Sequence, residues 1–264
     1  ISQTLDGGYI LGATNGGKSV LFKFDSSINK TNELLIDQDL YGYHTAGSFN
    51  DRQEGFADIH QAADGGYVIA TTSHLVKIGN NLTDYIWSTS TVGSTDKEGI
   101  KVFDKTSDGG FIMAVRNINT DASYTISKYN SNGSLESSSI PTVNNTHARI
   151  YDVLETSSGE YVVVGAIRNT STNRTDLFVQ KMSSGFSILW TKTFHEDDFS
   201  GISLNTPNWQ AVAKSVTETS EGSFVVVGSL SRRLSTDDLY NGGHEGSVLI
   251  KLDADGEESR TLGW

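Results

Sequence analysis

The sequence predicts an all-β fold built from repeated four-stranded antiparallel units, and three observations support this prediction. A short phrase that joins a glycine-containing turn to an apolar run occurs five times along the chain. The chain has only 2 prolines and no cysteine, while serine, threonine, glycine and asparagine are abundant, which is typical of turn-rich proteins. The aromatic residues that follow the five turns are on average roughly 54 residues apart, and such a period indicates a repeat architecture.

Each unit contains the recurring phrase, in which the turn leads into an aromatic residue and an apolar run. Asp-Gly between β-rich runs is a hairpin signal, because these residues tolerate the positive φ of a tight turn. The five phrases are QTLDGGYIL (3–11), QAADGGYVI (61–69), KTSDGGFIM (105–113), ETSSGEYVV (155–163) and ETSEGSFVV (218–226).

A second apolar segment follows in each unit and carries a lysine. We expect the lysine stem to pack along the strand and its ammonium to contact a neighbouring acid or carbonyl. A turn and a fourth segment complete the unit, most clearly in ILWTKTF (188–194). The second segments are VLFKF, HLVKI, YTISKY, LFVQKM and VLIKL, with Lys23, Lys77, Lys128, Lys181 and Lys251.

The second strand of each unit is apolar almost without alternation, as in YVVVG and FVVVG. Such strands are buried on both faces. Sheets that pack against neighbours on both sides form a β-propeller, so we expect a five-bladed β-propeller of four-stranded antiparallel blades in one domain, 1–264. A pair of β-sandwiches is the alternative, but it does not explain the period. The expected blades are about 1–40, 55–92, 99–141, 148–194 and 209–264.

The repeats resemble those of secreted β-propeller proteins of bacteria and archaea, the SBBP-type and DGGY repeats. The segments that carry the resemblance are GSFVVVG (222–228), VLIKLDADG (248–256) and ILWTKTF (188–194). The resemblance covers nearly the whole chain and implies an extracellular propeller without a shared catalytic residue. The first unit starts at an innermost-strand position, Ile1, so we expect 1–264 to be part of a longer chain.

Composition restricts the classes of partner. The formal net charge of −12 argues against nucleic acid and against anionic membrane surfaces, because no basic stripe is present to neutralise phosphates. The longest apolar runs are about seven residues, too short to insert into a bilayer. We therefore expect an extracellular or cell-surface protein that binds other copies, other surface proteins or cell-surface glycans.

The long irregular insertions 37–55, 195–210 and 232–246 are expected on the face opposite the tight turns. Binding residues lie preferentially in loops on a rigid scaffold, and aromatic side chains beside acids suit sugars or a protein partner. The sequence thus predicts a non-catalytic module for binding or structural display, of a kind that can form part of a larger assembly or filament. Its candidate binding residues are Tyr41, Tyr43, His44, His195, Trp209, Tyr240 and His244, with Phe49 and Phe199 as further exposed aromatics.

The alternative function is a carbohydrate-active enzyme or glycan-binding propeller that uses the central channel. Asp58 and Asp152 occupy one inner-strand position in two units, and glycoside hydrolysis requires two carboxylates; no third carboxylate stands out. No cofactor is expected, although DADGE places Asp253 and Asp255 as in the start of a calcium loop. Candidate N-glycosylation sites are Asn29, Asn81, Asn132, Asn144, Asn169 and Asn173.

Overall fold

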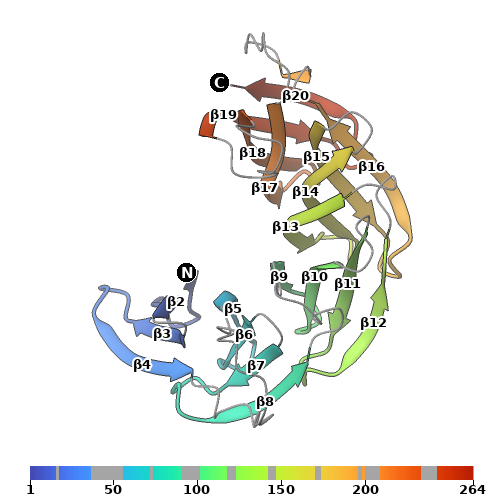
Figure 1. Cartoon of the computed structure of the whole chain (residues 1–264). Coiled ribbons are helices and arrows are strands. Elements are labelled where there is room, and N and C mark those ends of the chain that lie inside the picture. The colour runs from blue at the N-terminus through green and yellow to red at the C-terminus, as the bar shows by residue number, and fades with distance from the viewer. Residues whose placement is uncertain are drawn as a thin grey trace, which may run out of the picture.

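The computed structural model describes most of the chain. The described residues are 1–15, 18–36, 56–71, 74–90, 102–117, 123–141, 147–169, 174–195, 198–199, 209–232 and 243–263. Their strands are antiparallel and follow one another as four-stranded units around an open arc, with the first strand of each unit innermost and the fourth at the rim (Figure 1). This is a propeller-like all-β fold.

Three of the units are separate four-stranded sheets. Unit 1 comprises β1 (Ser2–Gln3), β2 (Tyr9–Asn15), β3 (Lys18–Phe24) and β4 (Lys30–Ile36). Unit 2 comprises β5 (Phe56–Gln61), β6 (Tyr67–Thr71), β7 (His74–Ile78) and β8 (Tyr85–Ser90). Unit 3 comprises β9 (Val102–Lys105), β10 (Phe111–Asn117), β11 (Ser123–Tyr129) and β12 (Leu135–Ser139).

The remaining strands form one eight-stranded sheet, in which two antiparallel units are joined by a parallel bridge between Thr175 and Gln210. Unit 4 comprises β13 (His147–Glu155), β14 (Tyr161–Asn169), β15 (Arg174–Met182) and β16 (Ile188–Phe194). Unit 5 comprises β17 (Trp209–Glu218), β18 (Phe224–Arg232), β19 (Gly243–Leu252) and β20 (Glu258–Gly263).

The two tight turns of each unit lie on the same face of the arc, because strand direction alternates. The first turn places a glycine at positive φ in every unit: Gly7, Gly65, Gly109, Gly159 and Gly222. The second turn also requires positive φ, and three units place a large apolar residue there. The residues at this position are Ile28, Leu82, Gly133, Phe186 and Gly256.

The recurring lysine lies beside a register shift in the third strand of each unit. The packing expected for it is confirmed: Lys77 Nζ lies 2.5 Å from Asp64 Oδ2, and Lys181 Nζ lies 2.7 Å from Glu160 Oε2. Lys181 also donates to the carbonyl of Ala254 in the next unit, at 3.2 Å. The lysines are therefore structural, joining a unit to its own first turn and, in units 1 and 4, to the next unit.

The core lies between successive units, as expected for strands buried on both sides. We call the side of a unit that meets the preceding unit its backward face, and the side that meets the following unit its forward face. The backward face of unit 2 presents six apolar side chains, one from β5, two from β6, two from β7 and one from the second turn. They are Ile59, Tyr67, Ile69, Val76, Ile78 and Leu82, and they pack with Ile10 and Leu21 on the forward face of unit 1.

Candidate functional site

Asp58 and Asp152 occupy equivalent places on the inner strands β5 and β13, directly after a register shift in each strand. Bulges of this kind redirect side chains and are frequent beside active sites. Each carboxylate accepts a hydrogen bond from the next backbone N–H, Ile59 N at 2.7 Å and Val153 N at 2.9 Å. The two residues predicted from the sequence thus share one geometry.

A third carboxylate and a histidine belong to the same inner region, so the expectation that no third carboxylate stands out is wrong. His60 Nε2 lies 3.4 Å from Asp58 Oδ2 and 3.8 Å from Asp104 Oδ1. Burial disfavours the charged imidazole, but Asp58 and Asp104 outweigh it and raise the pKa of His60. The sequence comparison considered the position that Asp58 and Asp152 hold, which is Val102 in unit 3. Asp104 lies two residues further along β9, so the comparison missed it.

Burial raises the pKa of Asp104 and of Asp152, and the charge of Asp58 adds to the shift of Asp152. Asp152 is also engaged by the next unit: Ser215 Oγ donates to its Oδ2 at 2.7 Å, and Val216 N donates to the same atom at 2.9 Å. The carboxylate therefore joins units 4 and 5. These groups form an inner polar cluster with a clear scaffold role, and in the described part of the chain no three His, Asp or Glu side chains are placed to hold a metal ion.

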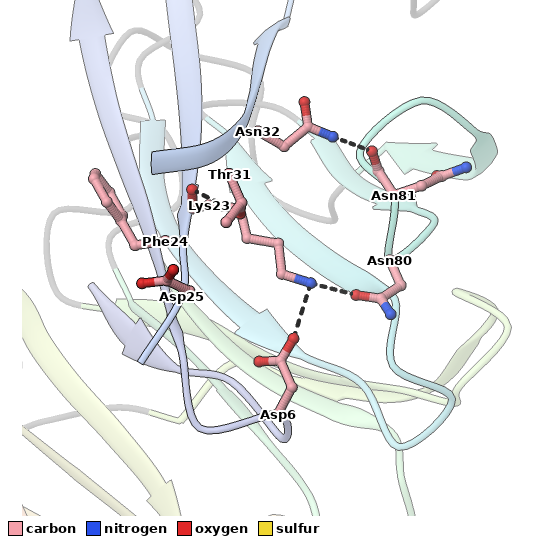
Figure 2. Close-up of a pocket in the computed structure, with 8 residues that line it drawn as sticks. All are labelled: Asp6, Lys23, Phe24, Asp25, Thr31, Asn32, Asn80 and Asn81. Atoms are coloured by element: carbon pink, nitrogen blue, oxygen red, sulfur yellow. Dashed lines mark hydrogen bonds and ion pairs between the residues drawn. The ribbon is translucent and has the colours of Figure 1, made fainter. Parts of the chain in front are cut away.

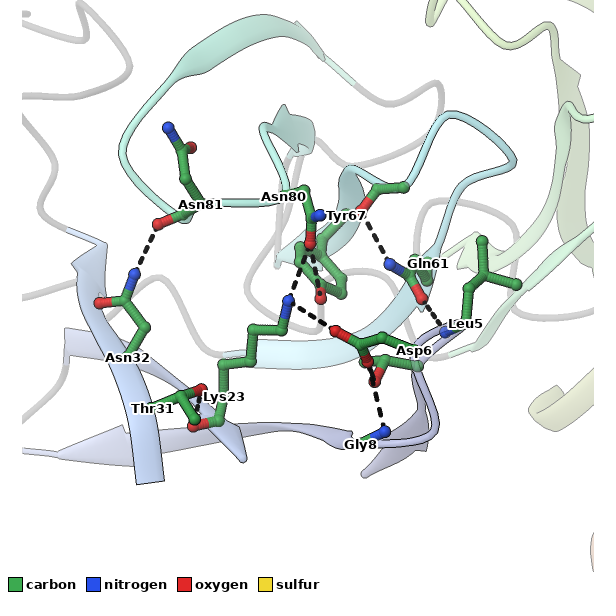
Figure 3. A network of polar contacts seen from close by, with 12 residues as sticks. Leu5, Asp6, Gly8, Lys23, Thr31, Asn32, Gln61, Tyr67, Asn80 and Asn81 are labelled. Atoms are coloured by element: carbon green, nitrogen blue, oxygen red, sulfur yellow. Dashed lines mark hydrogen bonds and ion pairs between the residues drawn. The ribbon is translucent and has the colours of Figure 1, made fainter. Parts of the chain in front are cut away.

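A polar pocket of about 350 Å³ lies on the turn face between units 1 and 2 (Figure 2). Lys23 Nζ contacts Asn80 Oδ1 at 2.8 Å and Asp6 Oδ2 at 3.2 Å, and Asn32 donates to the carbonyl of Asn81 at 2.6 Å (Figure 3). Hydrogen bonds from Thr4, then the contact with Lys23, lower the pKa of Asp6 to about 2. The side chains named here are largely paired with one another.

The outer strand contributes a short side chain, Asn32, to the lining of this pocket. Asn32 occupies the position that Trp87 holds in unit 2 and Trp190 in unit 4. Trp87 lies against Gly133 and Trp190 against Gly256, in each case in the second turn of the next unit. A short amide in place of an indole leaves the groove between units 1 and 2 unfilled.

The described residues include only part of the loop candidates. Tyr41, Tyr43, His44, Phe49 and Tyr240 lie outside the described residues, and for Trp209 and His244 only the backbone, in β17 and β19, is described. His195 is exposed, and its Nδ1 lies 2.8 Å from the buried Asp176. Phe199 is buried in the core shared by units 4 and 5, so its expected exposure is wrong. Among these residues, only His195 and Phe199 have described side chains, and the grouping of the loop candidates stays a prediction.

Three of the expected glycosylation residues and the expected calcium residues lie in tight turns, whereas Asn169 lies at the opposite end of its strand. The asparagines Asn29, Asn81 and Asn132 are exposed in the second turns of units 1, 2 and 3. Asn169 ends β14, while Asn144 and Asn173 lie outside the described residues. Asp253 Oδ1 accepts hydrogen bonds from the backbone of Asp255 and Glu257, so this carboxylate stabilises its own turn.

The backward face of unit 1 is uncovered, and this is the feature that the sequence reasoning missed. In units 2 to 5 the residues in the six backward-face positions are all buried. Each of them other than the glycines has at most 7% of its surface exposed. In unit 1, Ile1 is 78% and Ile28 is 72% exposed, and the other four side chains are only half-buried. The six residues are Ile1, Tyr9, Leu11, Phe22, Phe24 and Ile28.

The forward face of unit 5 is uncovered in the same way. Val227 is 42% exposed, and Val225 and Leu249 are half-buried. The residues at these three positions in units 2, 3 and 4 are fully buried: Val68, Ala70 and Leu75; Ile112, Ala114 and Ile126; Val162, Val164 and Val179. Aligning the third strands by their lysines would have identified both exposed faces. Each of these faces has the same pattern of apolar residues as the buried faces of the other units.

No protein-family model and no curated protein sequence matches the chain. Solved structures are similar in fold. A chain from the complex of Drosophila Plexin A with Semaphorin 1b matches with a TM-score of 0.52 and 9% identity, over 95% of this chain and 52% of that chain. A Bacteroides caccae protein of unknown function matches with a TM-score of 0.42 and 10% identity, over 97% of this chain and 93% of that one.

Hsv2 of Kluyveromyces lactis matches with a TM-score of 0.45 and 8% identity, over 88% of this chain and 58% of that chain. The chain thus spans about half the length of two of these three structures. At such identities the likeness concerns the fold alone. In the described residues there is no helix of the length and apolarity that crossing a membrane requires.

Proposed function

We propose that this protein is a non-catalytic β-propeller module of five four-stranded blades that acts outside the cell or on its surface. Its role is binding and structural display within a larger protein assembly. The observation that carries the proposal is the uncovered backward face of unit 1, where six apolar positions that are buried in every other unit meet solvent. Contiguous exposed apolar surface of this kind marks protein interaction sites.

Three of the six residues are aromatic, Tyr9, Phe22 and Phe24, and aromatic residues are enriched in protein interfaces. The rim of this face is polar, because Lys30 and Glu33 form an exposed ion pair on the neighbouring strand β4. An apolar centre with a polar rim is the composition of a protein-binding surface. The solvent-exposed sequons Asn29, Asn81 and Asn132 suit a surface protein, and their glycosylation is part of the proposal.

Thiol accessibility tests the proposal cleanly, because the chain has no cysteine of its own. Ile28→Cys and Leu82→Cys place one thiol at the same turn position of units 1 and 2. In the dilute purified chain we expect maleimide to label position 28 rapidly and position 82 slowly. In the native surface-attached protein we expect labelling of Ile28→Cys to fall to the rate of Leu82→Cys.

The control is Ser184→Cys, in an exposed turn of unit 4, which should label rapidly in both settings. Equal labelling of Ile28→Cys in the purified chain and on the native surface would mean that no partner covers this face, and the proposed function would be wrong.

Glycoside cleavage or glycan binding is the second candidate, favoured by the presence of Asp58, Asp104 and Asp152 in one inner cluster. The raised pKa of the half-buried Asp104 suits a proton donor. Incubation with a panel of polysaccharides distinguishes the candidates, since turnover that is lost in both Asp58→Asn and Asp152→Asn would replace the binding role by an enzymatic one.

A further inference from the structure

We propose that His60 makes the contact between units 2 and 3 pH-sensitive, so that this contact is strongest while the imidazole carries a proton and weakens as pH rises. We call the contact between the inner strands of two successive units a joint. His60 belongs to β5 of unit 2 and meets β9 of unit 3, so both sides of this joint lie inside the arc (Figure 1). The proposal is independent of what covers the face of unit 1.

Three acceptors surround a single ring nitrogen, His60 Nε2. The carbonyl oxygen of Phe103 lies 3.1 Å from it, Asp58 Oδ2 lies 3.4 Å from it and Asp104 Oδ1 lies 3.8 Å from it. One N–H donates a well-aligned hydrogen bond to only one acceptor, and the carbonyl is the nearest. The two carboxylates therefore act on the imidazole mainly through their charge. A neutral ring with its proton on Nε2 keeps the bond to Phe103 but loses the attraction to both carboxylates.

The imidazole is shielded enough for these charges to matter. Its side chain is 21% exposed, and its ring centre lies 5.1 Å from that of Phe103. Burial alone favours the neutral ring, but Asp58, Asp104 and the carbonyl of Phe103 outweigh it, so the pKa of His60 is raised. The charge of His60 in turn opposes the upward shift that burial gives to the pKa of Asp104. The two units are thus coupled electrostatically in both directions.

The direction of the pH effect follows from this shift. Because the pKa of His60 in the folded chain lies above its ordinary value of 6.5, folding favours the protonated ring. Its contribution to stability is fully present below pH 6.5 and is lost as pH rises through the folded pKa. Asp58 and Asp104 then share the joint without the cation that contacts both. Lys105 and Asp152 also act on Asp104, with opposite signs.

The joint between units 4 and 5 provides a comparison within the same chain. Asp152 is the carboxylate at the equivalent inner position, and its Oδ2 accepts hydrogen bonds from Ser215 Oγ at 2.7 Å and Val216 N at 2.9 Å. Leu154 and Thr217 stand at the positions that the imidazole and the third carboxylate hold in the other joint. Neither donor to Asp152 titrates near neutral pH. We therefore expect these two hydrogen bonds to persist as pH rises.

A double-mutant cycle with His60→Gln and Asp104→Asn tests the proposal, because it isolates the interaction between the two side chains. Urea denaturation of the four chains gives the coupling at about pH 6 and about pH 8.5. At the lower pH we expect a coupling of about two- to fivefold in the equilibrium constant of unfolding, the usual size for partly exposed ion pairs. At the higher pH the coupling should disappear. Both replacements are polar and similar in size, so the variants should fold.

Nuclear magnetic resonance titration of the imidazole is the second readout. The signal of His60 is the one that His60→Gln removes, and its midpoint should lie above pH 6.5 in the unmodified chain. Asp58→Asn and Asp104→Asn should each lower that midpoint, since each removes a negative charge beside the ring.

The control is the same cycle with Asp152→Asn and Ser215→Ala, whose coupling should be equal at both pH values. A His60 midpoint at or below pH 6.5 would overturn the inference, and so would a coupling between His60 and Asp104 that does not change with pH. A coupling that falls equally in the control pair would assign the pH effect to the whole chain and would also overturn it.

Discussion

Tyr67→Ala is expected to lower the free energy of unfolding by about 3–5 kcal/mol, the usual cost of deleting a fully buried aromatic side chain. Tyr67 is fully buried between units 1 and 2, and its hydroxyl lies 3.5 Å from Asn80 Oδ1. The Lys23 ammonium lies 5.8 Å from the centre of its ring. The substitution would remove apolar packing and a cation–π contact and would leave a cavity between the units.

Tyr9→Ala is the matched variant, because Tyr9 holds the same position in unit 1 and is only half-buried. We expect it to cost no more than about 2 kcal/mol, since solvent replaces part of the packing. Urea denaturation of the two variants and the unmodified chain, in dilute solution, measures both values. Equal losses for the two tyrosines would contradict the description of the unit 1 face as uncovered.

Gly165→Ala is expected to destabilise the chain by about 3 kcal/mol or more, because overpacking beside a fixed backbone forces the strands apart. A Cβ atom at Gly165 would lie 1.9 Å from the carbonyl oxygen of Arg149, which the register shift after Ile150 pushes toward β14. The glycine of VVVG therefore leaves room for the close approach of the inner strand to β14 in unit 4. Gly228 repeats the arrangement in unit 5, where a Cβ would lie 2.3 Å from Val212 O.

Gly185→Ala is the control for this prediction, since the nearest atom to its added Cβ would be Ser183 Oγ at 3.9 Å. Thermal unfolding should separate the two variants clearly. A Gly165→Ala chain as stable as Gly185→Ala would show that the inner strand of unit 4 does not approach β14 as described.

The sequence predicted the repeated four-stranded unit because the features that define it are local. Asp-Gly turns, apolar strands and the lysine at the register shift depend on neighbours within one unit, and the structure places them as expected. Even SSGE and SEGS, which depart from Asp-Gly, keep their glycine at positive φ, in Gly159 and Gly222.

The inner polar cluster and the exposure of the unit 1 face depend on contacts between units. A sequence pattern within one unit does not predict such contacts. His60 and Asp104 meet only because units 2 and 3 pack together. Ile28 adopts a φ of 65°, which a β-branched residue rarely does, and no turn signal in the sequence predicts it. The exposure of Phe22 and Phe24 follows from the absence of a unit packed against them in the single chain, whereas their sequence pattern is that of a buried strand.

Electron cryo-microscopy of the protein in its native assembly tests the central claim most directly. The account predicts density for a four-stranded sheet seated on the backward face of unit 1, in contact with Tyr9, Phe22 and Phe24. If those three side chains face solvent in the assembled particle, the claim that this face is the binding surface is contradicted.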